Sequence, residues 1–290
     1  MIFKGTYTAM VTPFNASGSV DYGKLRELVE EQVAAGVEGL VPVGTSGESP
    51  TLSMEEHSRV VEFVAETANR RVQVVAGTGA NSTAEAIEFT TEARKLGADA
   101  SLQVTPYYNK PTQEGVYRHF STIAEKSGLP AVIYNVPGRT GIAVAVETVA
   151  RLAKNPLMVA VKEAGGSVDR VSAIRDACDI TVLSGDDSLT VPMISVGAKG
   201  IISVASNVIP AEMVAMVKAA LDGDFKTAGA AHRKYYSLFR DLFIESNPIP
   251  VKAALAKLGK ISYEYRLPLC ELAPENLEKL CATMRACGLL

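Results

Sequence analysis

The segment LMVAVKEAGG, residues 157–166, contains an apolar run of strand length that ends at a lysine. Residues 157–161 are all apolar, and Gly165 and Gly166 indicate that the strand stops shortly after Lys162. A lysine at the mouth of an apolar strand is partly removed from water, which favours its neutral, nucleophilic amine over the ammonium. Such an amine can attack a ketone and form a Schiff base. The alternative is a strand-end lysine whose ammonium simply reaches solvent.

Apolar runs of this kind alternate along the chain with segments of helical periodicity. Strands are predicted within 5–13 and over 40–43, 72–76, 100–104, 131–134, 157–162, 181–183 and 200–204, and helices over 22–35, 54–68, 83–96, 113–126, 144–153, 168–177 and 189–196. Strands alternating with helices predict a parallel sheet, and eight such units predict a closed (β/α)8 TIM barrel. The alternative is an open doubly wound sheet. It usually has a G-x-G-x-x-G turn after its first strand, which the corresponding TPFNASGSVD segment lacks.

Beyond residue 207 the predicted pattern is helical to the end of the chain, with helices over 211–221, 226–244, 249–258 and 274–286. Their apolar faces need a surface to pack against, either the barrel or a partner subunit. We therefore expect an α/β protein with a barrel carrying the active site in residues 1–207. A C-terminal helical region in residues 208–290 would follow it.

Composition excludes several classes of function. The 29 Lys and Arg residues are balanced by 32 Asp and Glu, so no nucleic-acid surface is indicated, and no apolar run is long enough for a membrane helix. The three histidines are scattered, and the four cysteines lack metal-ligand spacing, so a metal site is not expected. The cysteines also suggest no disulfide framework, and the first residues lack a signal-peptide pattern. Both features favour the cytoplasm.

In a barrel of this class the active site lies at the C-terminal ends of the strands, so residues following the predicted strands are the candidates. After the second strand, Thr45 and Ser46 stand between two glycines. Backbone N–H groups in such a turn can hold a carboxylate, and the hydroxyls can transfer protons. The alternative is a tight turn that caps the next helix.

Aromatic and cationic side chains follow the fourth and fifth strands. Tyr107 and Tyr108 are adjacent in a loop, which exposes at least one phenol for catalysis or for packing at an interface. Tyr134 stands one strand before Lys162 at a comparable height, so its phenol could relay the protons of imine formation. Arg139, in a glycine-flanked loop, could bind a substrate carboxylate. An ordinary core tyrosine and a surface arginine are the alternatives.

The seventh strand ends at Ser184, Gly185, Asp186, Asp187 and Ser188. The simplest interpretation is that Asp187 or Ser188 caps the next helix. A metal site built on the two carboxylates is conceivable, but the sequence offers it no partner ligands.

Five motifs taken together carry a resemblance. GTSGE (44–48), TPYYNKP (105–111), YNVPGRTG (134–141), VKEAG (161–165) and GIISV (200–204) resemble, in this order, the dihydrodipicolinate synthase / N-acetylneuraminate lyase family. The likeness runs from Gly5 to about Leu258. The tyrosine pair and the PGRTG segment favour the synthases of this family over its sialic acid lyases.

The resemblance implies a role for each matching residue. Lys162 would form the Schiff base with pyruvate, and Tyr134, Thr45 and Tyr108 would relay protons, with Tyr108 supplied by the neighbouring subunit. The backbone of Thr45 and Ser46 would hold the pyruvate carboxylate; Ser46 replaces the usual threonine but keeps its hydroxyl. The remaining implied positions are Arg139 for the carboxylate of L-aspartate 4-semialdehyde, and Gly185 and Ile202 lining the pocket.

The resemblance also implies an assembly and a form of regulation. A homotetramer built from two tight dimers is expected, with a dimer as the alternative. Many of these synthases bind lysine as an inhibitor between the subunits of the tight dimer, and the matching polar positions here are Ser49, His57, Asn81, Glu85 and Tyr107. Met54 stands where lysine-sensitive bacterial members carry histidine, so weak or absent inhibition is expected.

The implied activity is condensation of pyruvate with L-aspartate 4-semialdehyde in lysine and diaminopimelate biosynthesis. Three alternatives remain open from the sequence. The first keeps the Schiff base with another aldehyde, as in N-acetylneuraminate lyase or a 2-keto-3-deoxy sugar acid aldolase. The others are a metal-dependent barrel aldolase, which the scarcity of histidine disfavours, and a non-catalytic binding barrel, which the lysine, tyrosine and threonine set disfavours.

Overall fold

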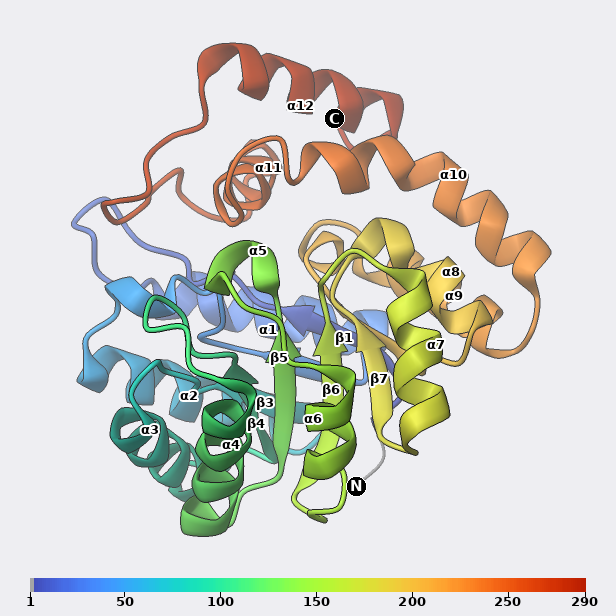
Figure 1. Ribbon diagram of the computed structural model, residues 1–290. Coiled ribbons are helices and arrows are strands. Elements are labelled where there is room, and N and C mark those ends of the chain that lie inside the picture. Colours follow the sequence, from blue (N-terminus) through green and yellow to red (C-terminus); the bar gives the residue numbers. More distant parts are fainter. Residues whose placement is uncertain (1–2) are drawn as a thin grey trace.

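Eight parallel strands form a closed barrel in chain order in the computed structural model, which describes residues 3–290 (Figure 1). This confirms the predicted (β/α)8 barrel. The strands are β1 (Gly5–Ala9), β2 (Gly39–Val41), β3 (Gln73–Gly77), β4 (Ala100–Val104), β5 (Ala131–Asn135), β6 (Met158–Glu163), β7 (Thr181–Ser184) and β8 (Gly200–Ser203).

Helices surround the barrel and continue beyond it. Those of the barrel part are α1 (Tyr22–Ala35), α2 (Met54–Ala68), α3 (Thr83–Lys95), α4 (Gln113–Ser127), α5 (Pro137–Thr140), α6 (Val146–Leu152), α7 (Val168–Ala177) and α8 (Thr190–Ser195). They are followed by α9 (Pro210–Leu221), α10 (Phe225–Asp241), α11 (Ile249–Lys257) and α12 (Pro274–Ala286), with short 3-10 helices at η1 (Ser49–Thr51), η2 (Asp187–Leu189) and η3 (Ala205–Asn207). No helix among residues 3–290 is both long and apolar enough to cross a lipid bilayer.

Local sequence explains where the helices begin and end. The side chain of Asp21 accepts a hydrogen bond from the Lys24 amide at the start of α1, and Gly36 ends that helix with φ 82°. Ser53 and Glu56 form a reciprocal capping box at the start of α2. These caps satisfy backbone groups that the helix itself leaves unpaired, so the predicted and observed boundaries of both helices agree.

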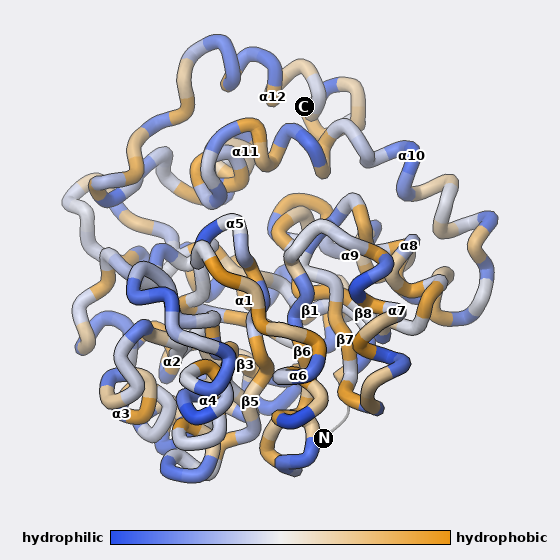
Figure 2. Tube along the Cα trace, in the orientation of Figure 1, coloured by the Kyte–Doolittle hydropathy of each residue, from blue (hydrophilic) through white to orange (hydrophobic). Residues whose placement is uncertain are grey.

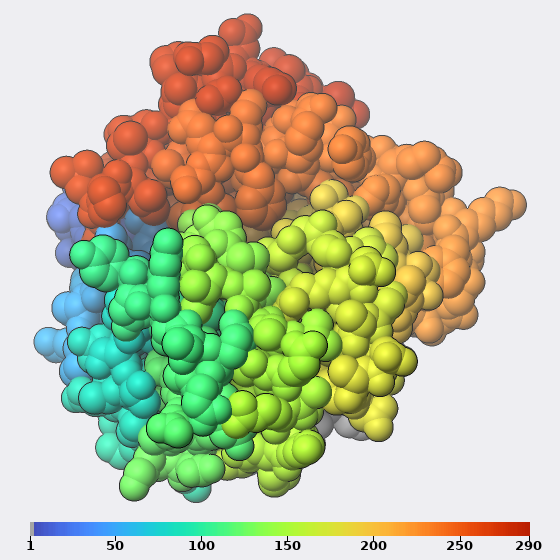
Figure 3. Space-filling model, viewed as in Figure 1, coloured from blue at the N-terminus to red at the C-terminus, as the bar shows by residue number. Residues whose placement is uncertain are grey.

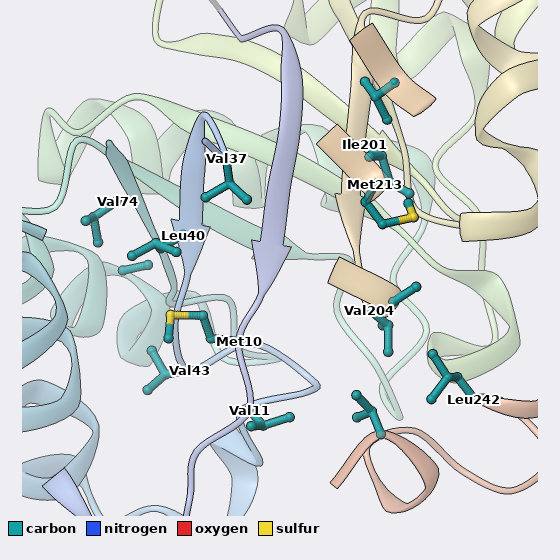
Figure 4. Close-up of a cluster of buried hydrophobic side chains, with 14 of the residues drawn as sticks. Met10, Val11, Val37, Leu40, Val43, Val74, Ile201, Val204, Met213 and Leu242 are labelled. Carbon is teal, nitrogen blue, oxygen red and sulfur yellow. The ribbon is translucent and has the colours of Figure 1, made fainter. Parts of the chain in front are cut away.

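Two apolar cores stabilise the fold. One fills the barrel interior and includes Tyr7, Leu102 and Ile202. The other lies between the barrel and its helices and extends to the helical region, with Val204 and Leu242 in one cluster (Figure 4). Hydrophobic segments accordingly follow the strands, and the outer helices alternate hydrophobic with hydrophilic segments (Figure 2). Such burial is the main favourable contribution to folding.

The C-terminal helices have two different positions. Helix α9 packs against β1 and β8, as the eighth helix of the barrel does. Helices α10, α11 and α12 lie across the end of the barrel toward which the strands point (Figures 1 and 3). We predicted a barrel of residues 1–207 and a helical region of residues 208–290. This division stays a prediction, and residues 1 and 2 lie outside the described residues.

One buried and one partly exposed ion pair connect this helical region to the barrel loops. Lys252 on α11 forms an ion pair with Glu48, and both side chains are fully buried. Arg266 forms a second pair with Glu56 and also donates to the Thr51 carbonyl, at 2.8 Å. Removing one partner of a buried pair leaves an uncompensated charge, so the helical region and the loops after β2 are expected to hold one arrangement.

Candidate active site

Lys162 and Tyr134 face each other inside the end of the barrel. They are paired residues of the parallel ladder between β6 and β5, so their side chains point the same way. Lys162 is 5% exposed and its Nζ lies 4.3 Å from the centroid of the Tyr134 ring. An amine and a phenol are thus in contact in a mostly dry environment.

A cavity of about 70 Å³ opens beside these two side chains at the C-terminal ends of the strands. Its lining includes Thr45, Ser46, Arg139 and Gly185 of the residues predicted from the sequence. Asn247, which was not predicted, also lines it, as does Asp186, which the sequence suggested only for a metal site. The strand ends that the sequence singled out therefore converge on one place.

A tight turn after β2 carries Thr45 and Ser46. The amides of Gly47 and Glu48 donate back to the carbonyls of Gly44 and Thr45, at 3.1 and 3.2 Å. No backbone hydrogen bond from the Thr45 or Ser46 amide occurs within residues 3–290. These two N–H groups at the cavity wall suit an anion such as a carboxylate.

Hydrogen bonds between the strands fix the Lys162–Tyr134 pair. Asn135 Nδ2, one residue after Tyr134, donates to Glu163 Oε1 at 2.8 Å, one residue after Lys162. The other oxygen of Glu163 accepts from Arg170 Nε at 2.8 Å, and the Glu163 side chain is fully buried. This charge-assisted network resists a shift in register that would separate the amine from the phenol.

Gly185 packs directly against the lysine. A Cβ at this position would lie 3.1 Å from Lys162 Cε and 2.5 Å from the Cβ of Ala164. Any larger residue would therefore displace the lysine side chain or the strand end. The predicted pocket position is one where only glycine leaves room for the amine.

The two aspartates after β7 differ from the sequence interpretation. Neither Asp187 nor Ser188 caps the following helix with its side chain, so that expectation was wrong. The Asp187 carboxylate instead accepts from Ser203 Oγ and from the amides of Val204 and Ala205, joining the end of β7 to the segment after β8. Burial raises the pKa of Asp187 to about 6. Hydrogen bonds to the end of β8 and to the residues after it, rather than helix capping, therefore fix the position of this side chain.

Asn247, in the segment between α10 and α11, connects two predicted site residues. Its Nδ2 donates to Ser46 Oγ at 3.0 Å, and its carbonyl accepts from Arg139 Nη2 at 3.0 Å. Arg139 sits on α5, a four-residue helix that begins at Pro137. The guanidinium thereby lies at the cavity, where it can meet a substrate carboxylate. No local pattern in the sequence signals this contact, which spans about 100 to 200 residues of chain.

Tyr108 lies outside the cavity of its own chain. It is 91% exposed and has φ 72°, a backbone conformation that costs free energy in a bulky residue. Asn81 supports the loop, donating to the Tyr107 carbonyl at 3.2 Å, while Asn109 donates to the Asn81 carbonyl at 2.9 Å. The loop is therefore held by hydrogen bonds in a strained backbone conformation that leaves the Tyr108 phenol exposed.

The remaining predicted residues also have defined places. Ile202 is fully buried in the barrel interior and is absent from the cavity lining, where Val204 stands instead. His57 is buried, with its Nε2 2.9 Å from the Gly77 carbonyl. Ser49 begins η1 and Glu85 lies in the first turn of α3. No group of three metal-ligating side chains occurs within residues 3–290.

Comparison with known proteins agrees with the motifs. The model of the Dihydrodipicolinate synthetase family matches residues 2–287. The chain belongs to this family. It is 53% identical over 291 residues to the 4-hydroxy-tetrahydrodipicolinate synthase of Geotalea uraniireducens, and the match covers 100% of both chains.

Solved structures of relatives have nearly the same backbone. The 4-hydroxy-tetrahydrodipicolinate synthase from Methylacidiphilum fumariolicum SolV gives a TM-score of 0.98 at 51% identity, covering 99% of this chain and 96% of that one. DHDPS from Cyanidioschyzon merolae, solved with lysine bound, gives 0.96 at 42% identity, covering 99% of each. The family and its fold are therefore established for this chain.

Proposed function

We propose that this protein catalyses the 4-hydroxy-tetrahydrodipicolinate synthase reaction, the condensation of pyruvate with L-aspartate 4-semialdehyde in lysine and diaminopimelate biosynthesis. The observation that carries the proposal is the contact of Lys162 Nζ with the Tyr134 ring, at 4.3 Å, inside a cavity that anion-binding groups also line. The full-length relatives named for this activity support it.

Pyruvate is attached to the enzyme in the first half of the reaction. Its carboxylate binds the free amides of Thr45 and Ser46, which places the ketone carbon against Lys162. The neutral amine attacks that carbon, and loss of water gives the iminium. Tyr134 donates the proton that leaves with the oxygen, and the Thr45 hydroxyl continues the relay toward solvent. Loss of a proton from the methyl group then produces the nucleophilic enamine.

The second half joins the two substrates. Arg139 binds the carboxylate of the semialdehyde, and the enamine carbon attacks the aldehyde. The amino group of the adduct then attacks the iminium carbon, the bond to Lys162 Nζ breaks, and the cyclic product leaves. The iminium is the electron sink, so the scheme requires no cofactor and no metal.

A homotetramer of two tight dimers would complete the site. Tyr108 is too exposed to serve its own chain, and its loop is held in a strained conformation. Placed across a dimer interface, its phenol reaches the relay of the neighbouring cavity. All four cysteines are free thiols, which fits work in the reducing cytoplasm.

Trapping of the Schiff base tests the proposal. Borohydride added with pyruvate should attach a stable mass to Lys162 and to no other lysine, including the buried Lys252, which is fixed by Glu48. Lys162→Ala should lose both the adduct and turnover. An aldehyde panel with pyruvate then identifies the second substrate. Turnover of L-aspartate 4-semialdehyde is expected, and preference for a sugar aldehyde would overturn the assignment.

A further inference from the structure

The cavity contains two hydrogen-bond acceptors that the mechanism above leaves without a task. Asp186 Oδ2 and Asn247 Oδ1 are buried and have no hydrogen-bond partner within residues 3–290. Both residues line the cavity together with Lys162 and Arg139. Buried acceptors without donors are unfavourable, so their natural complement is a ligand that carries several N–H or O–H groups.

The Asp186 backbone is held in a fixed place. Its amide donates to Ser184 Oγ at 3.1 Å, and its carbonyl accepts from Ser184 Oγ and Thr190 Oγ1, both at 2.9 Å. The contrast with Asp187 is informative, because both Asp187 oxygens are occupied by neighbours. Of two adjacent carboxylates, one joins strand ends, and the other belongs to a cavity-lining residue and keeps a buried oxygen without a partner among residues 3–290.

The electrostatics around Asp186 also favour a ligand that carries N–H groups. Burial raises the pKa of Asp186, and the positive charge of Lys162 only partly opposes the effect. When Lys162 becomes the Schiff base of pyruvate, the cavity still offers a carboxylate without a hydrogen-bonded cation. A substrate with its own cation would supply the missing partner.

We propose that Asp186 binds the α-ammonium group of L-aspartate 4-semialdehyde while Arg139 binds the carboxylate on the same carbon. This inference rests on the proposed function and names what makes the site specific for an amino acid aldehyde. Asn247 Oδ1 is the second acceptor of the ammonium group. Since the Asn247 carbonyl already accepts from Arg139 Nη2 at 3.0 Å, the sites for the anion and the cation are adjacent, as an α-amino acid requires.

The same contact serves ring closure, because an ammonium group cannot attack the iminium carbon. The Asp186 carboxylate takes one proton from the ammonium, leaving a neutral amine and a carboxylic acid. The amine nitrogen forms its bond to the iminium carbon, and the bond from that carbon to Lys162 Nζ breaks. The nitrogen of the adduct gives one proton to Lys162 Nζ, which leaves as the neutral amine, and loses another to solvent to give the cyclic imine. Asp186 then returns its proton to solvent, which restores the free enzyme.

Asp186→Asn tests the inference, since it preserves shape and removes the charge. The kcat/KM for L-aspartate 4-semialdehyde should fall at least about tenfold. Borohydride trapping of pyruvate on Lys162 should remain as in the wild type. Succinate semialdehyde, which lacks the amino group, serves as the matched probe. Its inhibition constant against L-aspartate 4-semialdehyde should stay the same or decrease. Asp179→Asn, at an exposed carboxylate, is the control substitution.

Each outcome decides a different point. If Asp186→Asn weakens both aldehydes equally, or neither, Asp186 does not bind the ammonium and only this inference fails. If the wild type makes no product from pyruvate and L-aspartate 4-semialdehyde, the proposed function fails and the inference with it. Loss of pyruvate trapping in Asp186→Asn would mean that Asp186 positions Lys162, which also overturns the proposal.

Discussion

The two ends of the barrel are both hollowed, yet only the smaller hollow has the chemistry of a site. The hollow at the N-terminal end measures about 630 Å³ and is lined by Tyr7, Gln73 and Asp99, among others. These three side chains are already paired: Tyr7 donates to Gln73 Oε1, at 2.5 Å, and Asp99 Oδ2 accepts from the Val74 amide, at 2.8 Å.

The cavity of about 70 Å³ at the other end is lined by Lys162 and by two turn amides and two acceptors that have no partner in the described part of the chain. Volume alone would place the site at the wrong end of the molecule. Pairing of polar groups separates the two ends, because a satisfied group stabilises the fold whereas an unsatisfied one is available to a ligand.

The largest expected effect is a difference in kcat between substitutions of two buried tyrosines, one at each end of the barrel. Tyr134→Phe should lower kcat by roughly 10²-fold to 10⁴-fold, since it removes a proton donor beside Lys162. Tyr7→Phe removes one hydrogen bond and should cost about 1 kcal/mol of unfolding free energy while leaving kcat and KM unchanged. Steady-state kinetics and urea unfolding of both variants measure the contrast. Equal kinetic losses in the two variants would abolish the distinction between the ends.

Tyr108 tests whether the active end is completed by another subunit. Tyr108→Phe should lower turnover by roughly 10²-fold, the lower range for proton-transfer catalysis. Mixing Tyr108→Phe with Lys162→Ala subunits should restore part of the activity, because some cavities then contain an intact lysine and an intact neighbouring phenol. The measurement is turnover after subunit exchange. No recovery in exchanged oligomers would assign Tyr108 to its own chain or to structure alone.

Arg139 tests whether the two substrates are bound by different groups of the cavity at the C-terminal ends of the strands. A charged contact to a carboxylate is worth more than a neutral hydrogen bond, so Arg139→Ala should raise the KM for the semialdehyde by about tenfold or more. The KM for pyruvate should change far less, because the turn amides of Thr45 and Ser46 bind that substrate. Equal increases in both constants would show that Arg139 only supports the cavity wall through Asn247.

The barrel could be predicted from the sequence because its signals are local. The strand of Lys162 and the helix over Val168–Ala177 follow from apolar periodicity and from glycines or caps at their ends. The convergence of Thr45, Tyr134 and Lys162 then follows from the barrel itself, since all three stand at strand ends.

Contacts between distant segments could not be predicted in this way. Asn247 reaches Ser46 across about 200 residues, and the helical pattern around it carries no trace of that bond. Asp187 was expected to cap a helix because capping is the local solution for an aspartate, yet the end of β8 and the two residues after it supplied three donors. Asp186 was considered from the sequence only as half of a metal site, because the lack of a partner for its Oδ2 among residues 3–290 is a property that only the folded structure reveals.

The smallest expected effect concerns inhibition by L-lysine. Here too, a polar group that is already hydrogen-bonded within the protein is less available to a ligand. Of the polar groups predicted to hold lysine, Asn81 is bonded to the Tyr107 carbonyl and His57 Nε2 to the Gly77 carbonyl. Burial lowers the pKa of His57, so its ring is neutral at pH 7 and adds no charge to the site.

Met54, 48% exposed, offers only a weak thioether acceptor where a hydrogen-bonding side chain would help. Losing one such bond weakens binding by roughly tenfold. We therefore expect lysine to inhibit weakly or not at all, although the Cyanidioschyzon merolae relative was solved with lysine bound. Titration of activity with L-lysine, and of Met54→His as the matched variant, measures this. Half-inhibition of the wild type at or below about 0.1 mM, well tighter than millimolar binding, would show that paired groups can still form a ligand site.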